Sequence, residues 1–236
     1  MSSSIVKDDI KTLILAGGRG TRAYPHTDYL PKPMLPVNGQ PIITHVMRLF
    51  ADQGYRRFVL SIGYRGEVIV DYFANKSLSW QIEIVPTGDD TDTGGRIARC
   101  QHLLGETFMA TYSDGLAKIE LDDLVAFHRS HGGLVTVTSV PMTSQYGAIE
   151  SAEDGRILRF TEKPTLPGHW INAGFMVFER GVFRHWEGDN LEREVLPRLC
   201  EKGLAYTYRS QALFKSMDTH KDQQDIEELC RSGKFP

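Results

Sequence analysis

The sequence predicts an α/β fold, in which a mixed and mainly parallel sheet is flanked by helices. Strand-like and helix-like segments alternate through the first half of the chain, and the second half is richer in strands. Strands that alternate with helices at this spacing favour right-handed βαβ units and a parallel sheet. We therefore expect one α/β domain over residues 1–236, whose later strands extend or cover the sheet.

The first half begins with the apolar run 12–16, which ends abruptly in two glycines and so reads as a buried strand. A helix follows near Pro41, where apolar residues recur at helical spacing until Gly54. The stretch 25–36 holds four prolines without an apolar period, which predicts an extended loop. The other elements expected here are strands at 58–62, 82–85 and 108–112 and helices at 67–75 and 94–104.

The second half shows no linker, repeat or low-complexity tract. Its segments are β-branched and aromatic, with little helix between them, which is typical of strands. The expected elements are strands at 134–138, 148–150, 157–160, 173–178 and 214–217 and helices at 192–199 and 222–230. The charged run 192–194 is expected to be a solvated helix face.

Composition excludes several classes of protein. The chain carries 27 Lys and Arg against 30 Asp and Glu, a net charge of −3, so we expect no nucleic-acid partner. No apolar run approaches the roughly 18–20 residues that cross a bilayer, and the start does not resemble a signal peptide, so we expect no membrane partner. Three widely spaced cysteines favour reduced thiols and a cytoplasmic location.

The segment 15–22, Leu-Ala-Gly-Gly-Arg-Gly-Thr-Arg, follows the first expected strand. Its glycines let backbone N–H groups approach a phosphate, because no Cβ stands in the way. Arg19 and Arg22 add fixed positive charge and paired donors. The segment therefore predicts a phosphate-binding loop, although a glycine-rich turn without a ligand remains open.

Two familiar phosphate-binding motifs do not fit this loop. It lacks the Gly-Lys-Ser/Thr ending of a Walker A sequence. Gly18, Gly20 and Ala23 match a dinucleotide fingerprint, but prolines forbid the helix that must follow, and position 40 is Gln rather than acidic. Ten residues on, Lys32 lies between two prolines, which would hold its side chain in a defined direction.

The run L-A-G-G-x-G-T-R followed by P-K-P-M resembles the signature of the sugar-1-phosphate nucleotidyltransferases. Further stretches similar to that family occur in its order along nearly the whole chain, and within the family the chain looks most like the glucose-1-phosphate cytidylyltransferases. The stretches are Thr93–Arg96, Tyr112–Leu116, Tyr146–Gly147, Glu162–Pro164, Asn172–Gly174 and Lys215–Thr219.

The resemblance implies an enzyme with the Rossmann-like nucleotide-diphospho-sugar transferase fold, which joins a nucleoside triphosphate to a sugar 1-phosphate and releases pyrophosphate. CTP and glucose 1-phosphate are the favoured substrates. The nucleotide-binding part would span about 1–115 and the sugar-phosphate-binding part about 116–236. A homo-oligomer is expected. The resemblance also implies catalytic roles for Arg22, Lys32 and Lys163, nucleotide contacts from Leu15, Ala16, Gly17, Gly18, Gly20, Thr21, Thr93, Gly94, Gly95 and Ser113, sugar contacts from Tyr146, Gly147, Glu162 and Asn172, and Mg²⁺ ligands in Asp114 and Asp218.

Several alternatives stay open at this point. Asp114 also suits a turn before Gly115, and Asp218 also suits the N-cap of a helix. The same chemistry with GTP or dTTP, or with a heptose or amino-sugar phosphate, is a rival to CTP and glucose 1-phosphate. A sensor that binds nucleotide sugars without catalysis is a second rival. The role of Arg96 is open.

Overall fold

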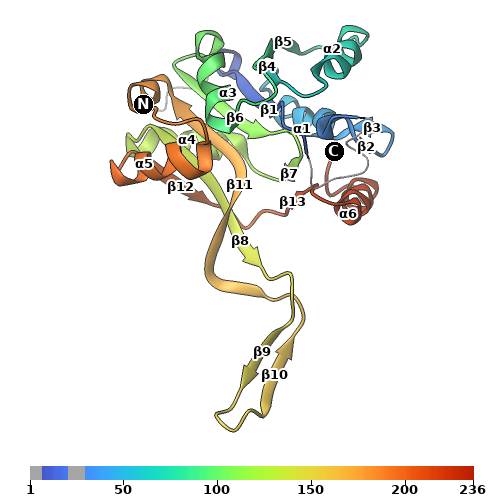
Figure 1. Cartoon of the computed structure of the whole chain (residues 1–236), viewed down its shortest axis with the longest axis vertical. Helices are drawn as coiled ribbons and strands as arrows, with labels where there is room; N and C mark the ends of the chain where they lie inside the picture. The colour runs from blue at the N-terminus through green and yellow to red at the C-terminus, as the bar shows by residue number, and fades with distance from the viewer. Residues whose placement is uncertain (1–6, 21–29) are drawn as a thin grey trace.

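A computed structural model describes residues 7–20 and 30–236 of the chain (Figure 1). The helices are α1 (Ile42–Ala51), α2 (Gly66–Ala74), α3 (Thr93–Cys100), α4 (Leu121–His131), α5 (Leu196–Glu201) and α6 (His220–Arg231). The strands are β1 (Thr12–Ala16), β2 (Pro36–Val37), β3 (Gln40–Pro41), β4 (Arg57–Ile62), β5 (Gln81–Pro86), β6 (Thr107–Tyr112), β7 (Gly115–Ala117), β8 (Val135–Thr143), β9 (Ala148–Ser151), β10 (Ile157–Thr161), β11 (Thr165–Glu179), β12 (Ala205–Arg209) and β13 (Phe214–Ser216).

The central sheet has seven strands in the order β12-β8-β11-β6-β1-β4-β5. β1 is parallel to both β4 and β6, and β5 is parallel to β4. β11 is antiparallel to its neighbours β6 and β8, and β12 is parallel to β8. The mixed, mainly parallel sheet predicted from the sequence is confirmed, and its later strands extend it at one edge.

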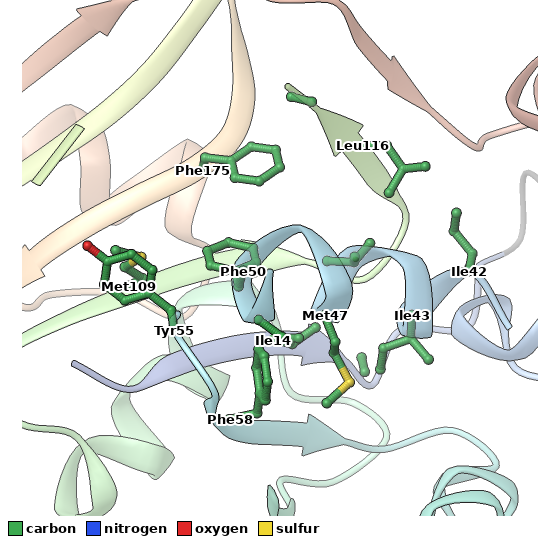
Figure 2. Packing of buried hydrophobic residues seen from close by; sticks show 14 of the residues in the cluster. Ile14, Ile42, Ile43, Met47, Phe50, Tyr55, Phe58, Met109, Leu116 and Phe175 are labelled. Carbon is green, nitrogen blue, oxygen red and sulfur yellow. The ribbon is translucent and has the colours of Figure 1, made fainter. Parts of the chain in front are cut away.

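Buried side chains form one hydrophobic core on each face of the sheet. Alternate residues of a strand point to opposite faces, so Ile14 of β1 joins one core while Leu13 joins the other. The first core lies beneath α1, whose Phe50 stacks on Phe175 of β11 with ring centroids 5.6 Å apart (Figure 2). The second core lies beneath α3 and α5. Burial on both faces explains why β1 is apolar from Leu13 to Ala16.

Some elements differ from the expectation. Residues 32–34 form a 3-10 turn rather than extended chain, because Pro31 takes the N-cap and Pro33 suits a first turn. The expected helix 192–199 begins as a π-helix at Leu191–Val195 and continues as α5. No residue ranges were predicted from the sequence for α4 or for β12.

A long hairpin projects from the body of the molecule. β8 and β11 run out of the sheet together and lead into the antiparallel pair β9 and β10, which lies far from the other elements (Figure 1). Five large apolar side chains on or beside this pair are between 58% and 78% exposed: Tyr146, Ile149, Ile157, Leu158 and Phe160. Such a concentration of exposed apolar surface is typical of an interaction site.

α6 begins with a capping box that fixes the chain after Asp218. The Thr219 hydroxyl accepts from the backbone N–H of Asp222, and the Asp222 carboxylate accepts from the backbone N–H of Thr219 at 2.9 Å. Asp222 also pairs with Lys215 at 2.7 Å. Asp218 itself is not the cap, since Thr219 is.

Asp222→Asn is expected to lower the free energy of unfolding by about 1 kcal/mol at pH 7. Burial alone would raise the pKa of Asp222, but Lys215 and Thr219 outweigh it, and the pKa is lowered. A lowered pKa in the folded state stabilises above the unfolded value of about 3.9, and this contribution is lost as the pH falls through the folded value. Urea unfolding measures the free energy of unfolding of the wild type and of Asp222→Asn. The difference between the two proteins should be smaller near pH 3 than at pH 7. Asp225→Asn, which removes a Lys215 ion pair but keeps the capping box, is the control; an equal loss from both variants would contradict the capping role.

Candidate active site

A cavity of about 710 Å³ opens at the carboxyl ends of the parallel strands. In the sheet, β1 has β4 on one side and β6 on the other, so the order of the strands reverses at β1. Ligands of open α/β sheets bind at such a point, where the strand order reverses. Ten predicted site residues line the cavity: Leu15, Gly17, Gly18, Gly20, Lys32, Thr93, Ser113, Asp114, Asn172 and Asp218.

Lys32 joins the two carboxylates predicted to bind metal. Its Nζ lies 2.5 Å from Asp114 Oδ2 and 2.9 Å from Asp218 Oδ1, although the two aspartates are far apart in sequence. Lys32 is buried. Burial by itself lowers the pKa of Lys32, but the carboxylates of Asp114 and Asp218 outweigh it, and the pKa is raised. The ammonium therefore stays charged and balances the two carboxylates.

The same two carboxylates are the residues that could hold a divalent cation. Asp114 follows β6 and Asp218 follows β13, and both oxygens converge on one positive charge. Mg²⁺ commonly takes only one or two carboxylates and completes its shell with phosphate oxygens and water. The described residues hold no cluster of three or more acidic, His or Cys side chains suited to a metal ion. The donor set fits a cation that is bound together with a phosphorylated substrate.

The Arg96 side chain packs against the glycine loop and donates a hydrogen bond to its backbone. Its guanidinium donates to Gly17 O at 2.9 Å, to Thr87 Oγ1 at 2.7 Å and to Ile62 O at 3.3 Å. A Cβ on Gly17 would lie 1.9 Å from Arg96 Nη1, so a side chain at that position would clash with the guanidinium. Burial lowers the pKa of Arg96. Arg96 thus joins the carboxyl ends of β1, β4 and β5.

Gly94 and Gly95 face the segment 189–192 and do not line the cavity, whereas Thr93 does. The Gly95 N–H donates to Asp189 O at 2.8 Å, so it is already used within the protein. A Cβ on Gly95 would lie 1.9 Å from Asp189 Oδ1. These contacts explain the two glycines by close packing, and of the three nucleotide contacts predicted here only Thr93 lines the cavity.

Gly94→Ala is therefore expected to destabilise the fold by about 1–3 kcal/mol, because the added methyl group would lie 2.9 Å from the backbone oxygen of Asp189 and overpack this contact. Gly18→Ala is the control, since a Cβ there would meet no atom within 4 Å. Thermal unfolding of the two variants compares them directly. Equal stability would contradict the packing explanation.

Several lining residues were missed from the sequence: Tyr112, Asn190, Glu192 and Arg193. Glu192 is exposed, as predicted for 192–194, but it also lines the cavity. Its carboxylate accepts from the Tyr112 hydroxyl and from Thr93 Oγ1. The π-helix directs this side chain into the site, and a charged run on an expected helix gave no signal of that.

Four predicted residues lie away from the cavity, on the projecting hairpin: Tyr146, Gly147, Glu162 and Lys163. They are nevertheless close to one another, since a Cβ on Gly147 would lie 2.4 Å from Phe160 and 3.1 Å from Glu162 Oε2. Ala16 belongs to β1 but is not among the lining residues. Thr21 and Arg22 lie outside the described residues.

Comparison with known proteins agrees with this architecture. The model of the family described as nucleotidyl transferase matches residues 11–222. The chain belongs to the nucleotidyl transferase family. The transferase is 33% identical over 253 residues to glucose-1-phosphate cytidylyltransferase of Salmonella typhi, covering 96% of this chain and 98% of that protein. It is 35% identical over 223 residues to mannose-1-phosphate guanylyltransferase of Mycobacterium tuberculosis, covering 90% of this chain but 62% of that protein.

Among solved structures, HddC from Yersinia pseudotuberculosis matches the transferase with a TM-score of 0.74 and 21% identity, over 94% of this chain and 99% of that one. This likeness confirms the nucleotide-sugar transferase fold. Together, the family and its relatives show that the protein is an enzyme of the sugar-1-phosphate nucleotidyltransferase type. Its substrates are a nucleotide and a sugar phosphate. None of the described helices is long and apolar enough to span a membrane.

Proposed function

We propose that the transferase joins the cytidylyl group of CTP to glucose 1-phosphate and that Mg²⁺ assists the reaction. The observation that carries the proposal is the cluster of Lys32, Asp114 and Asp218 beside the glycine loop, in a chain similar to a glucose-1-phosphate cytidylyltransferase over nearly its whole length. The sensor alternative predicts loss of the catalytic side chains. Lys32, Asp114 and Asp218 are all present and brought together.

The reaction needs positioning and charge neutralisation more than a protein nucleophile. An oxygen of the sugar phosphate attacks the α-phosphorus of the triphosphate in line, the bond to the β-phosphate bridging oxygen breaks, and pyrophosphate leaves. Both substrates are anions, so their approach must be helped by fixed positive charge and backbone donors. When bound, Mg²⁺ would neutralise phosphate charge.

Within this scheme the backbone amides of Gly17, Gly18 and Gly20 hold the triphosphate, together with Arg22. Lys32 would exchange its contacts with the two carboxylates for contacts with phosphate oxygens, and Asp114 and Asp218 are the residues that would hold Mg²⁺. The cavity supports these roles because all of these residues except Arg22, which lies outside the described residues, line it.

The acceptor side would be formed by Asn172 with Tyr146, Gly147, Glu162 and Lys163. Asn172 lines the cavity, while the other four lie on the hairpin. The four hairpin residues can contact the sugar phosphate only if the hairpin approaches a cavity, either that of its own chain or that of a second copy. The proposed division into a nucleotide part of about 1–115 and a sugar-phosphate part of about 116–236 rests on this grouping. The cytoplasmic location stays a prediction.

Pyrophosphate release is the direct test of the substrates. CTP, dTTP, UTP, GTP and ATP should each be crossed with glucose 1-phosphate and several other sugar 1-phosphates in the presence of Mg²⁺. The proposal predicts the highest kcat/KM for CTP with glucose 1-phosphate and loss of turnover with EDTA. GTP with another sugar phosphate is the second candidate, because a guanylyltransferase is 35% identical to this chain. A preference for that pair would overturn the cytidylyl assignment but keep the reaction type.

We also propose that the transferase is a homo-oligomer, in which the hairpin packs against a second copy. The exposed apolar side chains on and beside β9 and β10 support this assembly, because packing against a second copy would remove their apolar surface from water. Light scattering should give the mass of a dimer or larger, and Phe160→Asp should shift it toward the monomer. A monomeric wild type at micromolar concentration would contradict the assembly.

A mixture of two inactive variants tests whether the hairpin serves a neighbouring cavity. Asp114→Asn removes a cavity residue and Lys163→Ala removes a hairpin residue, so a shared site would regain part of the activity when the variants are mixed. Activity that stays absent in a mixed oligomer would place the hairpin residues at the cavity of their own chain.

A further inference from the structure

The backbone around Asp218 is held on both sides by hydrogen bonds. The Met217 N–H donates to Asp114 O at 2.9 Å. The next two N–H groups, those of Asp218 and Thr219, both donate to Asp222 Oδ2, at 3.2 Å and 2.9 Å. Three successive backbone N–H groups are therefore used within the protein. Because this backbone is fixed, the Asp218 carboxylate can take only the directions that its side-chain torsions allow.

Each oxygen of the Asp218 carboxylate contacts a side chain of the cavity wall. Oδ1 lies 2.9 Å from Lys32 Nζ, and Oδ2 accepts from the Ser216 hydroxyl at 3.4 Å. Ser216 is paired with Gly115 between β13 and β7, directly after Asp114. The carboxylate of Asp218 is thus aimed at the ammonium that also contacts Asp114, and this aim starts from the fixed backbone.

Asp222 faces hydrogen-bond donors with both of its oxygens. Oδ2 accepts from the Thr219 hydroxyl at 2.8 Å in addition to the two backbone N–H groups. Oδ1 lies 2.7 Å from Lys215 Nζ, which also pairs with Asp225 at 2.9 Å. A carboxylate satisfies both sets of donors, whereas an amide would turn its NH₂ group toward one of them. This position therefore requires an acid rather than its isosteric amide.

We propose that Asp222 is a positioning residue, which acts through the backbone of Asp218 to place its carboxylate for a divalent cation shared with Asp114. Asp218 lines the cavity, whereas Asp222 and Lys215 do not, so Asp222 lies behind the site. Lys215 balances the charge of Asp222 and so limits its repulsion of Asp218. This inference rests on the proposed function, since it assumes that Asp114 and Asp218 hold Mg²⁺.

Asp222→Asn keeps the shape of the side chain but leaves one set of donors without an acceptor. We expect the Kd of Mn²⁺, in the presence of the triphosphate that the pyrophosphate assay selects, to rise about tenfold. The relaxation of water protons by bound Mn²⁺ measures this Kd without turnover. The Mg²⁺ concentration for half-maximal activity should rise by a similar factor, while kcat at saturating Mg²⁺ stays within about twofold of the wild type.

Two control variants separate positioning from the stability of α6. Thr219→Ala removes the hydroxyl that caps α6 but leaves both backbone N–H groups on Asp222. Asp225→Asn removes a partner of Lys215 but no bond to Asp218. Both controls should bind Mn²⁺ within about twofold of the wild type.

The outcomes distinguish this inference from the proposed function. Unchanged Mn²⁺ affinity in Asp222→Asn would overturn the inference alone. An equal loss of affinity in either control variant would do the same, because general loosening of α6 or of the Lys215 pair would then explain the effect. A wild type that binds no Mn²⁺ in the presence of the triphosphate would overturn the metal assignment of the proposed function and this inference with it.

Discussion

Asp114→Asn is expected to fold like the wild type and to lose at least about a hundredfold in kcat. The amide keeps the shape of the carboxylate but removes a negative charge that the proposal assigns to Mg²⁺. Asp114 sits at the end of β6, and its oxygen lies 2.5 Å from Lys32, so the substitution acts at the centre of the cluster. Steady-state pyrophosphate release at saturating substrates measures the loss.

Two comparisons make this result specific. Asp123→Asn, on the exposed side of α4, should retain full activity and controls for loss of a carboxylate. The concentration of Mg²⁺ that gives half-maximal activity should rise in Asp114→Asn. An active Asp114→Asn enzyme with an unchanged Mg²⁺ requirement would remove the metal assignment.

Lys32→Met should affect both stability and turnover. The ammonium separates two carboxylates, and an uncharged side chain of similar length leaves Asp114 and Asp218 to repel each other. We expect the free energy of unfolding to fall by about 1–2 kcal/mol, since both carboxylates are partly exposed to solvent. Turnover should fall by about a hundredfold, because the phosphates lose a fixed positive charge.

Magnesium gives this variant its distinctive behaviour. Added Mg²⁺ should stabilise Lys32→Met more than the wild type, because a cation then replaces the missing ammonium between the carboxylates. Urea unfolding with and without Mg²⁺ measures the difference. Lys11→Met, which breaks the Lys11–Glu83 pair at 2.7 Å, should show no such dependence on Mg²⁺. The same response in both variants would mean that the two aspartates do not form a common cation site.

The parallel half of the fold and the glycine loop could be predicted because their signals are local. The apolar run 12–16 ending in glycine specifies both a buried strand and the turn that follows it. Lys32, Asp114 and Asp218 were identified by their order along the chain. The distance between the two aspartates depends instead on the separate two-stranded pair of β7 and β13, which places Gly115 opposite Ser216.

Other parts of the site depend on contacts that no local pattern reveals. Arg96 lies in a predicted helix, yet its role comes from two distant carbonyl groups, those of Gly17 after β1 and Ile62 at the end of β4. Glu192 reads as a surface charge, but the extra residue in the π-helix turns it toward Tyr112. The hairpin residues illustrate a third case, because Lys163 can be recognised in sequence while its distance from the cavity is set by the length of β8 and β11.

In the proposed reaction, an oxygen of the sugar phosphate attacks the α-phosphorus of the nucleotide and stays with the sugar. Glucose 1-phosphate carrying the heavy oxygen isotope in its phosphate should be incubated with unlabelled CTP and Mg²⁺, and both products examined by mass spectrometry. We expect all of the label to remain in the nucleotide sugar and pyrophosphate to be unlabelled. Label in pyrophosphate, or an unlabelled nucleotide sugar, would contradict nucleotidyl transfer by this site.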